Sequence, residues 1–153
     1  MSNNKKQNNQ PDILQSIVIG IFRALWWLIK LPFGGMRSGS RRGNLSIENR
    51  NYLVDRRLEI EKMLKTTSVL ELKQALIEAD KLVDHALKLQ HFQGETFADR
   101  LRSAERQIKP RLYQEIWQGH KIRNELVHEQ QASVSAVELK SSAEKLLSYI
   151  KSI

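Results

Sequence analysis

From residue 46 to the C-terminus, apolar side chains recur every three or four positions, the spacing of a helix with one buried face. A first helix is predicted from Ile47 to Lys65. Ser68 and Glu71 have the spacing of a capping box and open a second helix, which runs to about His91. The apolar positions of this second helix are Leu72, Leu76, Ala79, Val83, Ala86 and Leu87.

Two further helices follow the Gly94 break. Thr96 with Asp99 resembles another cap and predicts a third helix that ends near Ile108. Pro110 fits the first turn of a fourth helix, because the amide hydrogen that proline lacks would have no helical partner there. The apolar positions of the fourth helix are Leu112, Ile116, Trp117, Ile122, Leu126 and Val127.

A fifth helix is predicted after Ser135, which forms a capping-box pattern with Glu138. Its apolar positions are Val137, Leu139, Leu146, Leu147 and Ile150. No stretch alternates with period two for long enough to make a strand, and short connections favour antiparallel neighbours. Residues 46–153 are therefore predicted to form an all-α, antiparallel bundle of four to five helices.

The N-terminal part of the chain has a different pattern. Residues 1–11 are polar and rich in Asn and Gln, which predicts a disordered tail. Residues 12–33 are mostly apolar, and residues 34–45 form a basic segment rich in Gly and Ser, typical of a flexible linker. The domain organisation is thus a tail, an apolar helix, a linker and a bundle.

The apolar stretch Ile13–Phe33 is about as long as the ~20 residues that cross a bilayer as a helix. Arg23 lies at its centre, where a charge costs roughly 2.5–3.5 kcal/mol on insertion scales. Arg23 and Lys30 fall on one helical stripe, which suits a helix lying in the interface with Trp26 and Trp27 at headgroup depth. Membrane association is expected, and spanning and in-plane arrangements stay open. The alternative is an amphipathic helix that packs on the bundle or pairs with itself.

Charge is distributed unevenly between these regions. The chain carries 25 Lys and Arg against 17 Asp and Glu, a net charge of +8, most of it before residue 51. This bias favours attraction to a membrane surface, and the basic residues Arg37, Arg41 and Arg42 would place the C-terminal body on the cytoplasmic side of a spanning helix. The absence of cysteine excludes disulfides and thiolate metal sites.

The densest group of chemically useful side chains lies late in the fourth helix. His120, Asn124 and His128 are four positions apart and share a face, while Arg123 and His128 are about 140° apart around the axis. One copy therefore does not aim Arg123 and His128 at one point unless the helix ends or bends between them. Two copies around a two-fold axis could place both pairs in one cleft.

The segment Arg123-Asn124-Glu-Leu-Val-His128 resembles the signature of HEPN domains, in which an arginine and a polar residue precede a histidine. Residues 76–87, 94–101 and 116–124 also resemble the helices before that motif in bacterial members, so the likeness covers roughly residues 66–150. The resemblance implies a small helical domain. Many such domains are metal-independent ribonucleases with a site shared across a homodimer.

If that activity applies, the implied catalytic residues are Arg123, Asn124 and His128, with His120 and Lys121 as further binding residues. Arginine suits the phosphate oxygens, and a histidine titrating near neutral pH suits the proton transfers of RNA cleavage by its own 2′-hydroxyl. Asn124 would orient His128 or the phosphate. No metal or other cofactor is implied.

Two other functions remain open on the same residues. The domain is a non-catalytic module that binds nucleic acid or nucleotides, or it is a protein-interaction scaffold in which Arg123 and His128 complement the dipole at a helix C-terminus. In HEPN proteins paired with a nucleotidyltransferase antitoxin, a tyrosine lies two places after the histidine. Gln130 occupies that position here, so that mode of control is not expected.

Four other polar residues have simpler interpretations. His85 and His91 are expected at the surface. Asp80 and Asp84 are expected to form a solvated or interhelical stripe on the second helix, with a supporting role at the site as the less favoured alternative.

Overall fold

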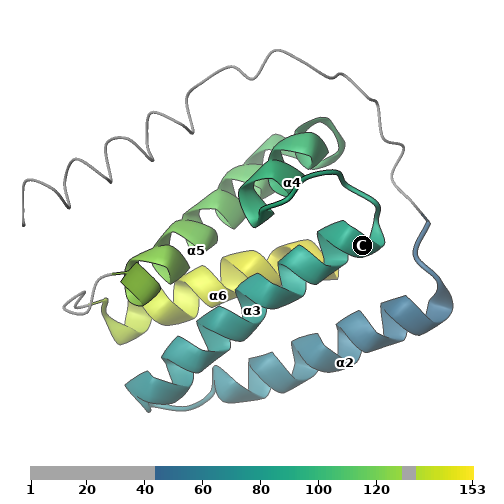
Figure 1. Cartoon of the computed structure of the whole chain (residues 1–153). Helices are drawn as coiled ribbons and strands as arrows, with labels where there is room; N and C mark the ends of the chain where they lie inside the picture. Colours follow the sequence, from purple (N-terminus) through teal and green to yellow (C-terminus); the bar gives the residue numbers. More distant parts are fainter. Residues whose placement is uncertain (1–43, 129–133) are drawn as a thin grey trace, which may run out of the picture. The chain divides into compact units, whose positions relative to one another are not determined.

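The computed structural model describes residues 44–128 and 134–153, apart from the side chain of His128. All regular structure in these residues is helical, which confirms the predicted all-α bundle (Figure 1). The helices are α2 (Ile47–Met63), α3 (Val69–Leu89), α4 (Phe97–Ala104), the 3₁₀ turn η1 (Glu105–Gln107), α5 (Pro110–His128) and α6 (Ala136–Lys151).

Side chains cap the helices largely where the sequence predicts. Thr96 and Asp99 form a complete capping box at the start of α4, and Ser135 and Glu138 form another at α6. At α3 the hydroxyl of Ser68 accepts from the backbone N–H of Glu71, while the return bond from the Glu71 side chain is not formed. The prediction of a full capping box there was therefore wrong in its second half.

The third predicted helix is shorter than expected. α4 ends at Ala104, the chain tightens into η1, and Ile108 is extended with φ −106° and ψ 137°. Pro110 follows closely, and the residue before a proline is sterically pushed away from the helical region. The chain therefore has to leave the helix before Lys109, and a 3₁₀ turn is a common way to end it.

α3 and α6 form the centre of the bundle, with α2 on one side of this pair and α5 on the other (Figure 1). The core lies where these helices meet. Every predicted apolar position of α3 is buried, from Leu72 to Leu87, as are four of the five predicted on α6. Val127 and Val137, predicted as apolar core positions, are instead 51% and 77% exposed. Both lie next to the terminal residue of a helix, Val127 at the end of α5 and Val137 at the start of α6.

Gly119 allows α5 to approach α6 closely. A Cβ atom at this position would lie 2.6 Å from Cγ of Leu146 and 2.8 Å from the carbonyl oxygen of Ser142. These distances are shorter than van der Waals contact, so any larger residue would push the two helices apart. Gly119 thus sets the distance between α5 and α6, and with it the position of the α5 residues that follow, including those of the candidate site.

None of the helices described here is both long and apolar enough to cross a membrane. The predicted tail (1–11), membrane helix (12–33) and most of the linker (34–45) lie outside the described residues, so these interpretations stay predictions.

Candidate functional site

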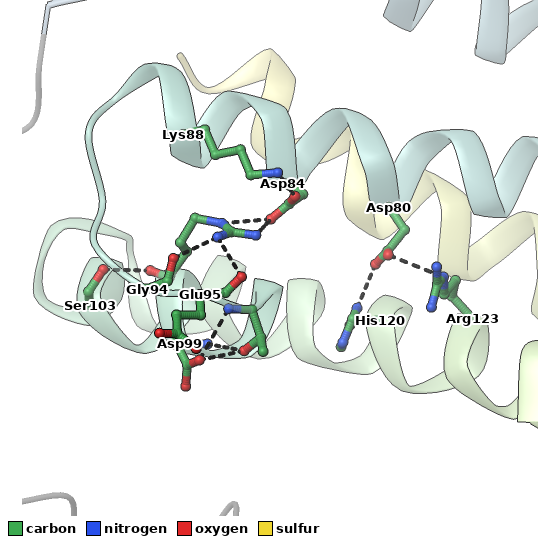
Figure 2. Close-up of polar contacts among 11 residues, drawn as sticks. Asp80, Asp84, Lys88, Gly94, Glu95, Asp99, Ser103, His120 and Arg123 are labelled. Carbon is green, nitrogen blue, oxygen red and sulfur yellow. Dashed lines mark hydrogen bonds and ion pairs between the residues drawn. The ribbon is translucent and has the colours of Figure 1, made fainter.

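Asp80 is a buried carboxylate on α3 that faces two residues of α5 (Figure 2). One oxygen, Oδ1, lies 2.7 Å from Nδ1 of His120. The other, Oδ2, lies 3.4 Å from Nε of Arg123. Only 6% of the Asp80 side chain is exposed. The carboxylate can be buried because a guanidinium and an imidazole N–H replace the water that it loses. Of the two positions expected for Asp80, solvated or interhelical, the structure shows the interhelical one.

Asn124 closes the contacts of Asp80 into a ring of four side chains. Its Oδ1 accepts a hydrogen bond from Nη1 of Arg123 at 3.0 Å, and its Nδ2 lies 3.0 Å from Nε2 of His120. Because an amide nitrogen is a donor, Nε2 of His120 must accept and Nδ1 must carry the hydrogen that Asp80 receives. The three hydrogen bonds then have matching donors and acceptors, and the ion pair between Asp80 and Arg123 completes the ring. We call Asp80, His120, Arg123 and Asn124 the polar ring.

An aromatic wall supports the polar ring from the side of α4. The ring of Phe97 stacks on His120 with 4.0 Å between centroids and 8° between planes. Trp117 meets the same imidazole edge-on at 6.2 Å, and the guanidinium of Arg102 lies over Trp117 at 5.8 Å. Stacking on one face and hydrogen bonds at both nitrogens leave His120 little freedom to rotate.

Burial also affects Tyr113, one turn before Trp117. Burial raises the pKa of the Tyr113 hydroxyl above its ordinary value, because the phenolate would lose its hydration. Its ring packs edge-on against Trp117 at 6.2 Å. Tyr113 therefore serves this wall as a neutral packing residue.

A second ion pair fixes α4 itself, one helical turn along α3 from Asp80 (Figure 2). Nε and Nη2 of Arg100 lie 2.8 and 2.6 Å from Oδ1 of Asp84, and Lys88 approaches the other oxygen at 2.7 Å. Nη1 of Arg100 donates to the carbonyl oxygens of Gly94 and Glu95 at 2.7 and 3.1 Å. We call Asp84 and Arg100 the clamp, because they hold the loop before α4 against α3.

Arg123 is less completely satisfied than Arg100. Its Nε is buried and near Asp80, but it is not aligned for a hydrogen bond with any atom. Nη2 makes no hydrogen bond or ion pair to any residue in the described ranges, and 27% of the side chain is exposed. A buried donor without a partner costs about 1–3 kcal/mol. The fold therefore holds Arg123 in a position that intramolecular contacts alone do not optimise.

The structure places most of the sequence-predicted site residues together. Arg123 and Asn124 are joined directly, and His120 and Asn124 share a face as predicted. The side chain of Lys121 is 60% exposed, and its Nζ lies 3.8 Å from Oε1 of Glu125. His128 is the last residue of α5, and its side chain lies outside the described part of the structure.

Sequence reasoning underestimated Asp80 and missed Phe97. A signal for Asp80 was present, because it follows Leu76 by four positions and so continues a row of buried residues along α3. A carboxylate in such a row requires a buried partner. Phe97 gave no comparable signal, since a single aromatic residue after a cap does not show which side chain it will stack on.

None of the protein-family models, curated proteins or solved structures compared with this chain matches it.

Proposed function

We propose that this domain is a metal-independent endoribonuclease in which Arg123 binds the scissile phosphate and His128 transfers protons. The HEPN-like spacing of Arg123 and His128 motivates the reaction. The observation that carries the proposal is the state of Arg123, whose guanidinium lies between Asp80 and Asn124 while its Nη2 forms no hydrogen bond or ion pair with any residue in the described ranges.

Orientation before binding is what phosphate recognition by arginine needs. The ion pair with Asp80 and the hydrogen bond from Nη1 to Asn124 hold the guanidinium, so an incoming phosphate does not have to immobilise a long flexible side chain. The Asp80 carboxylate balances the charge of Arg123, which lowers general attraction to polyanions and leaves recognition to hydrogen-bond geometry. This arrangement favours a phosphodiester held at a defined position over loose binding along a strand.

A second copy of the chain completes the site in this proposal. α5 runs without a break from Arg123 to His128, so the two positions lie about 140° apart around the helix axis. A pair of α5 helices around a two-fold axis would contribute two arginines and two histidines to one cleft.

In the reaction, a neutral His128 accepts the proton of the RNA 2′-hydroxyl as its oxygen attacks phosphorus. The bond from phosphorus to the 5′-oxygen breaks, and the His128 of the second copy, protonated beforehand, gives that oxygen a proton. The products are a 2′,3′-cyclic phosphate and a 5′-hydroxyl. The first His128 has gained one proton and the His128 of the second copy has lost one, so the net proton count is unchanged. Arg123 stabilises the extra negative charge on the phosphate oxygens.

The test uses the full-length chain and a mixed-sequence single-stranded RNA with a fluorescent 5′ end, in excess chelator. Arg123→Ala should lower the cleavage rate by about 10²-fold or more, because one transition-state donor is lost. His128→Ala should lower it by a similar or larger factor, about 10²–10⁴. RNA with 2′-deoxy sugars throughout should stay intact with every variant.

Arg111→Ala is the matched control, because Arg111 is also on α5, carries the same charge and is 92% exposed with a single contact to Glu115. Its rate should stay at the wild-type level. Wild-type protein that leaves RNA intact both in chelator and in magnesium would refute the nuclease. If the uncleavable 2′-deoxy strand still binds and Arg123→Ala abolishes that binding, the domain is a binding module.

We also propose, from the sequence of residues 12–33, that the chain associates with membranes and places its helical body on the cytoplasmic face. The support is the apolar run with Trp26 and Trp27 and the basic residues after it. Full-length protein should float with anionic phospholipid vesicles in a density gradient. Recovery of the protein entirely in the lipid-free fraction would contradict the proposal.

A further inference from the structure

α2 carries apolar side chains on two sides, and only one of them faces the bundle. Leu53 and Ile60 are buried against the core. On the side away from the core lies a second row, which we call the outer stripe: Ile47, Asn51, Val54 and Leu58. Its three apolar members are 81%, 37% and 44% exposed in chain order. A helix that only covered a bundle would carry polar residues there.

The spacing within the outer stripe is four, three and four residues, which is the a and d spacing of a coiled coil. Ile47, Val54 and Leu58 fall within about 40° of one another around the helix. Asn51 and Leu58 take the a positions, and Ile47 and Val54 take the d positions. A single asparagine at an a position among apolar residues is a device that sets the register and strand number of paired helices.

Charges on the two flanks of the outer stripe have opposite signs. Arg50 and Arg57 lie along one flank, and Glu48 and Asp55 lie along the other. Arg57 pairs with Glu61 within the helix, whereas Arg50, Glu48 and Asp55 form no ion pair with any residue in the described ranges. Three charged groups are thus available next to an exposed apolar row.

This pattern selects one occupant and one orientation. In a parallel pair of α2 helices, the basic flank of each copy faces the acidic flank of the other, with Arg50 opposite Asp55 of the second copy. In an antiparallel pair, basic would face basic and acidic would face acidic. We propose that two copies of this chain associate through the outer stripe of α2, with the two helices parallel.

The outer stripe spans less than two heptads, which is short for a free coiled coil. α2 is already folded against α3 and α6, however, so pairing does not have to supply the free energy of forming the helix. The resulting association should be weak to moderate.

This contact is distinct from the one in the proposed nuclease site. α3 and α6 lie between α2 and α5, so pairing through α2 does not bring two α5 helices into one cleft (Figure 1). A chain that used both contacts would carry two different two-fold interfaces and assemble beyond a dimer.

The test is disulfide trapping in the full-length chain, purified in a mild detergent, because the native sequence has no cysteine to interfere. Under mild oxidation, Val54→Cys and Ile47→Cys should each give a covalent dimer on a non-reducing gel, since each d position faces its own copy in a parallel pair. Val137→Cys is the control, because Val137 is 77% exposed but lies on a different helix. This variant should remain monomeric.

Two outcomes overturn the proposal. Equal dimer formation by Val137→Cys would mean random collision. The second outcome is that Ile47→Cys gives no covalent dimer by itself but cross-links when it is mixed with Leu58→Cys. That result would mean an antiparallel pair, in which a d position faces an a position of the other copy.

Charge exchange gives a second, fold-preserving test. Arg50→Glu and Asp55→Arg should each weaken the dimer by roughly fivefold in sedimentation equilibrium, because exposed ion pairs are individually small. The two changes together should restore the wild-type dissociation constant. A wild-type protein that sediments as a monomer, or a double variant no better than the singles, would refute the parallel contact. None of these measurements depends on whether RNA is cleaved.

Discussion

The polar ring and the clamp are two aspartate–arginine pairs built one helical turn apart on α3, yet the two arginines are held very differently. Arg100 in the clamp uses all three nitrogens, on Asp84 and two backbone carbonyls, and its side chain is 9% exposed. Arg123 in the polar ring is 27% exposed and forms one aligned hydrogen bond, to Asn124. A fully satisfied arginine contributes to stability, whereas one held in place with spare donors is available to a ligand.

The difference arises from what surrounds each guanidinium. The clamp closes on the loop at Gly94, whose backbone has φ +150° and whose carbonyl faces Arg100. A Cβ atom at Gly94 would lie 2.6 Å from the backbone nitrogen of Arg100, so the loop fits only without a side chain. The polar ring instead contains only side chains, and backbone carbonyls of α5 are occupied by its own helix.

The largest expected contrast is in stability. Arg100→Ala should lower the free energy of unfolding by about 3 kcal/mol, because Asp84 loses its main partner and two backbone carbonyls are left unsatisfied. Arg123→Ala should lower it by about 1 kcal/mol, since His120 still satisfies one oxygen of Asp80. Urea unfolding followed by circular dichroism measures both. Equal losses would show that the polar ring is as structural as the clamp.

A smaller contrast is expected from Gly119→Ala. The added methyl group would separate α5 from α6 and cost about 1–3 kcal/mol of stability. It should also shift the amide resonances of α5 around His120 and Arg123 more than those of α4, because the clamp connects α4 to α3 independently of α6. Two-dimensional NMR of the variant tests this. Shifts spread evenly over both helices would mean that the two regions move as one unit.

The smallest expected effect concerns pH. The hydroxyl of Thr96 donates to Asp99 and holds the pKa of that carboxyl below its ordinary value of 3.8. A carboxyl with a lowered folded pKa stabilises the fold fully above its unfolded pKa, and this contribution disappears as pH falls through the folded value. Asp99→Asn should therefore reduce stability at neutral pH by less than about 1 kcal/mol, the size of a capping interaction.

The thermal midpoints of wild type and Asp99→Asn should converge as pH is lowered below the ordinary range of aspartate. Ser135 lowers the pKa of Glu138 in the second capping box in the same way. Glu138→Gln should show the same convergence, so it serves as a parallel case at the far end of the bundle. A constant difference between wild type and variant at all pH values would contradict a role for the carboxylate charge.

The sequence by itself determined the helical class, most helix limits and the face that each helix buries. These follow from local physics, because caps such as Thr96 with Asp99 and the spacing of Leu72 to Leu87 act within one or two turns. The same reasoning placed His120 and Asn124 on one face, since that relation is internal to α5. The third helix was predicted too long, since α4 ends at Ala104 and a 3₁₀ turn follows it.

Tertiary structure alone decided which charged residues meet. Asp80 and Asp84 are equivalent in sequence terms, and nothing local assigns Arg123 to one and Arg100 to the other. That choice depends on how α4 and α5 pack against α3, and so on contacts between residues 16 to 43 positions apart. Burial then sets the consequence, because a carboxylate removed from water must take its partners from whichever helix the packing brings within reach.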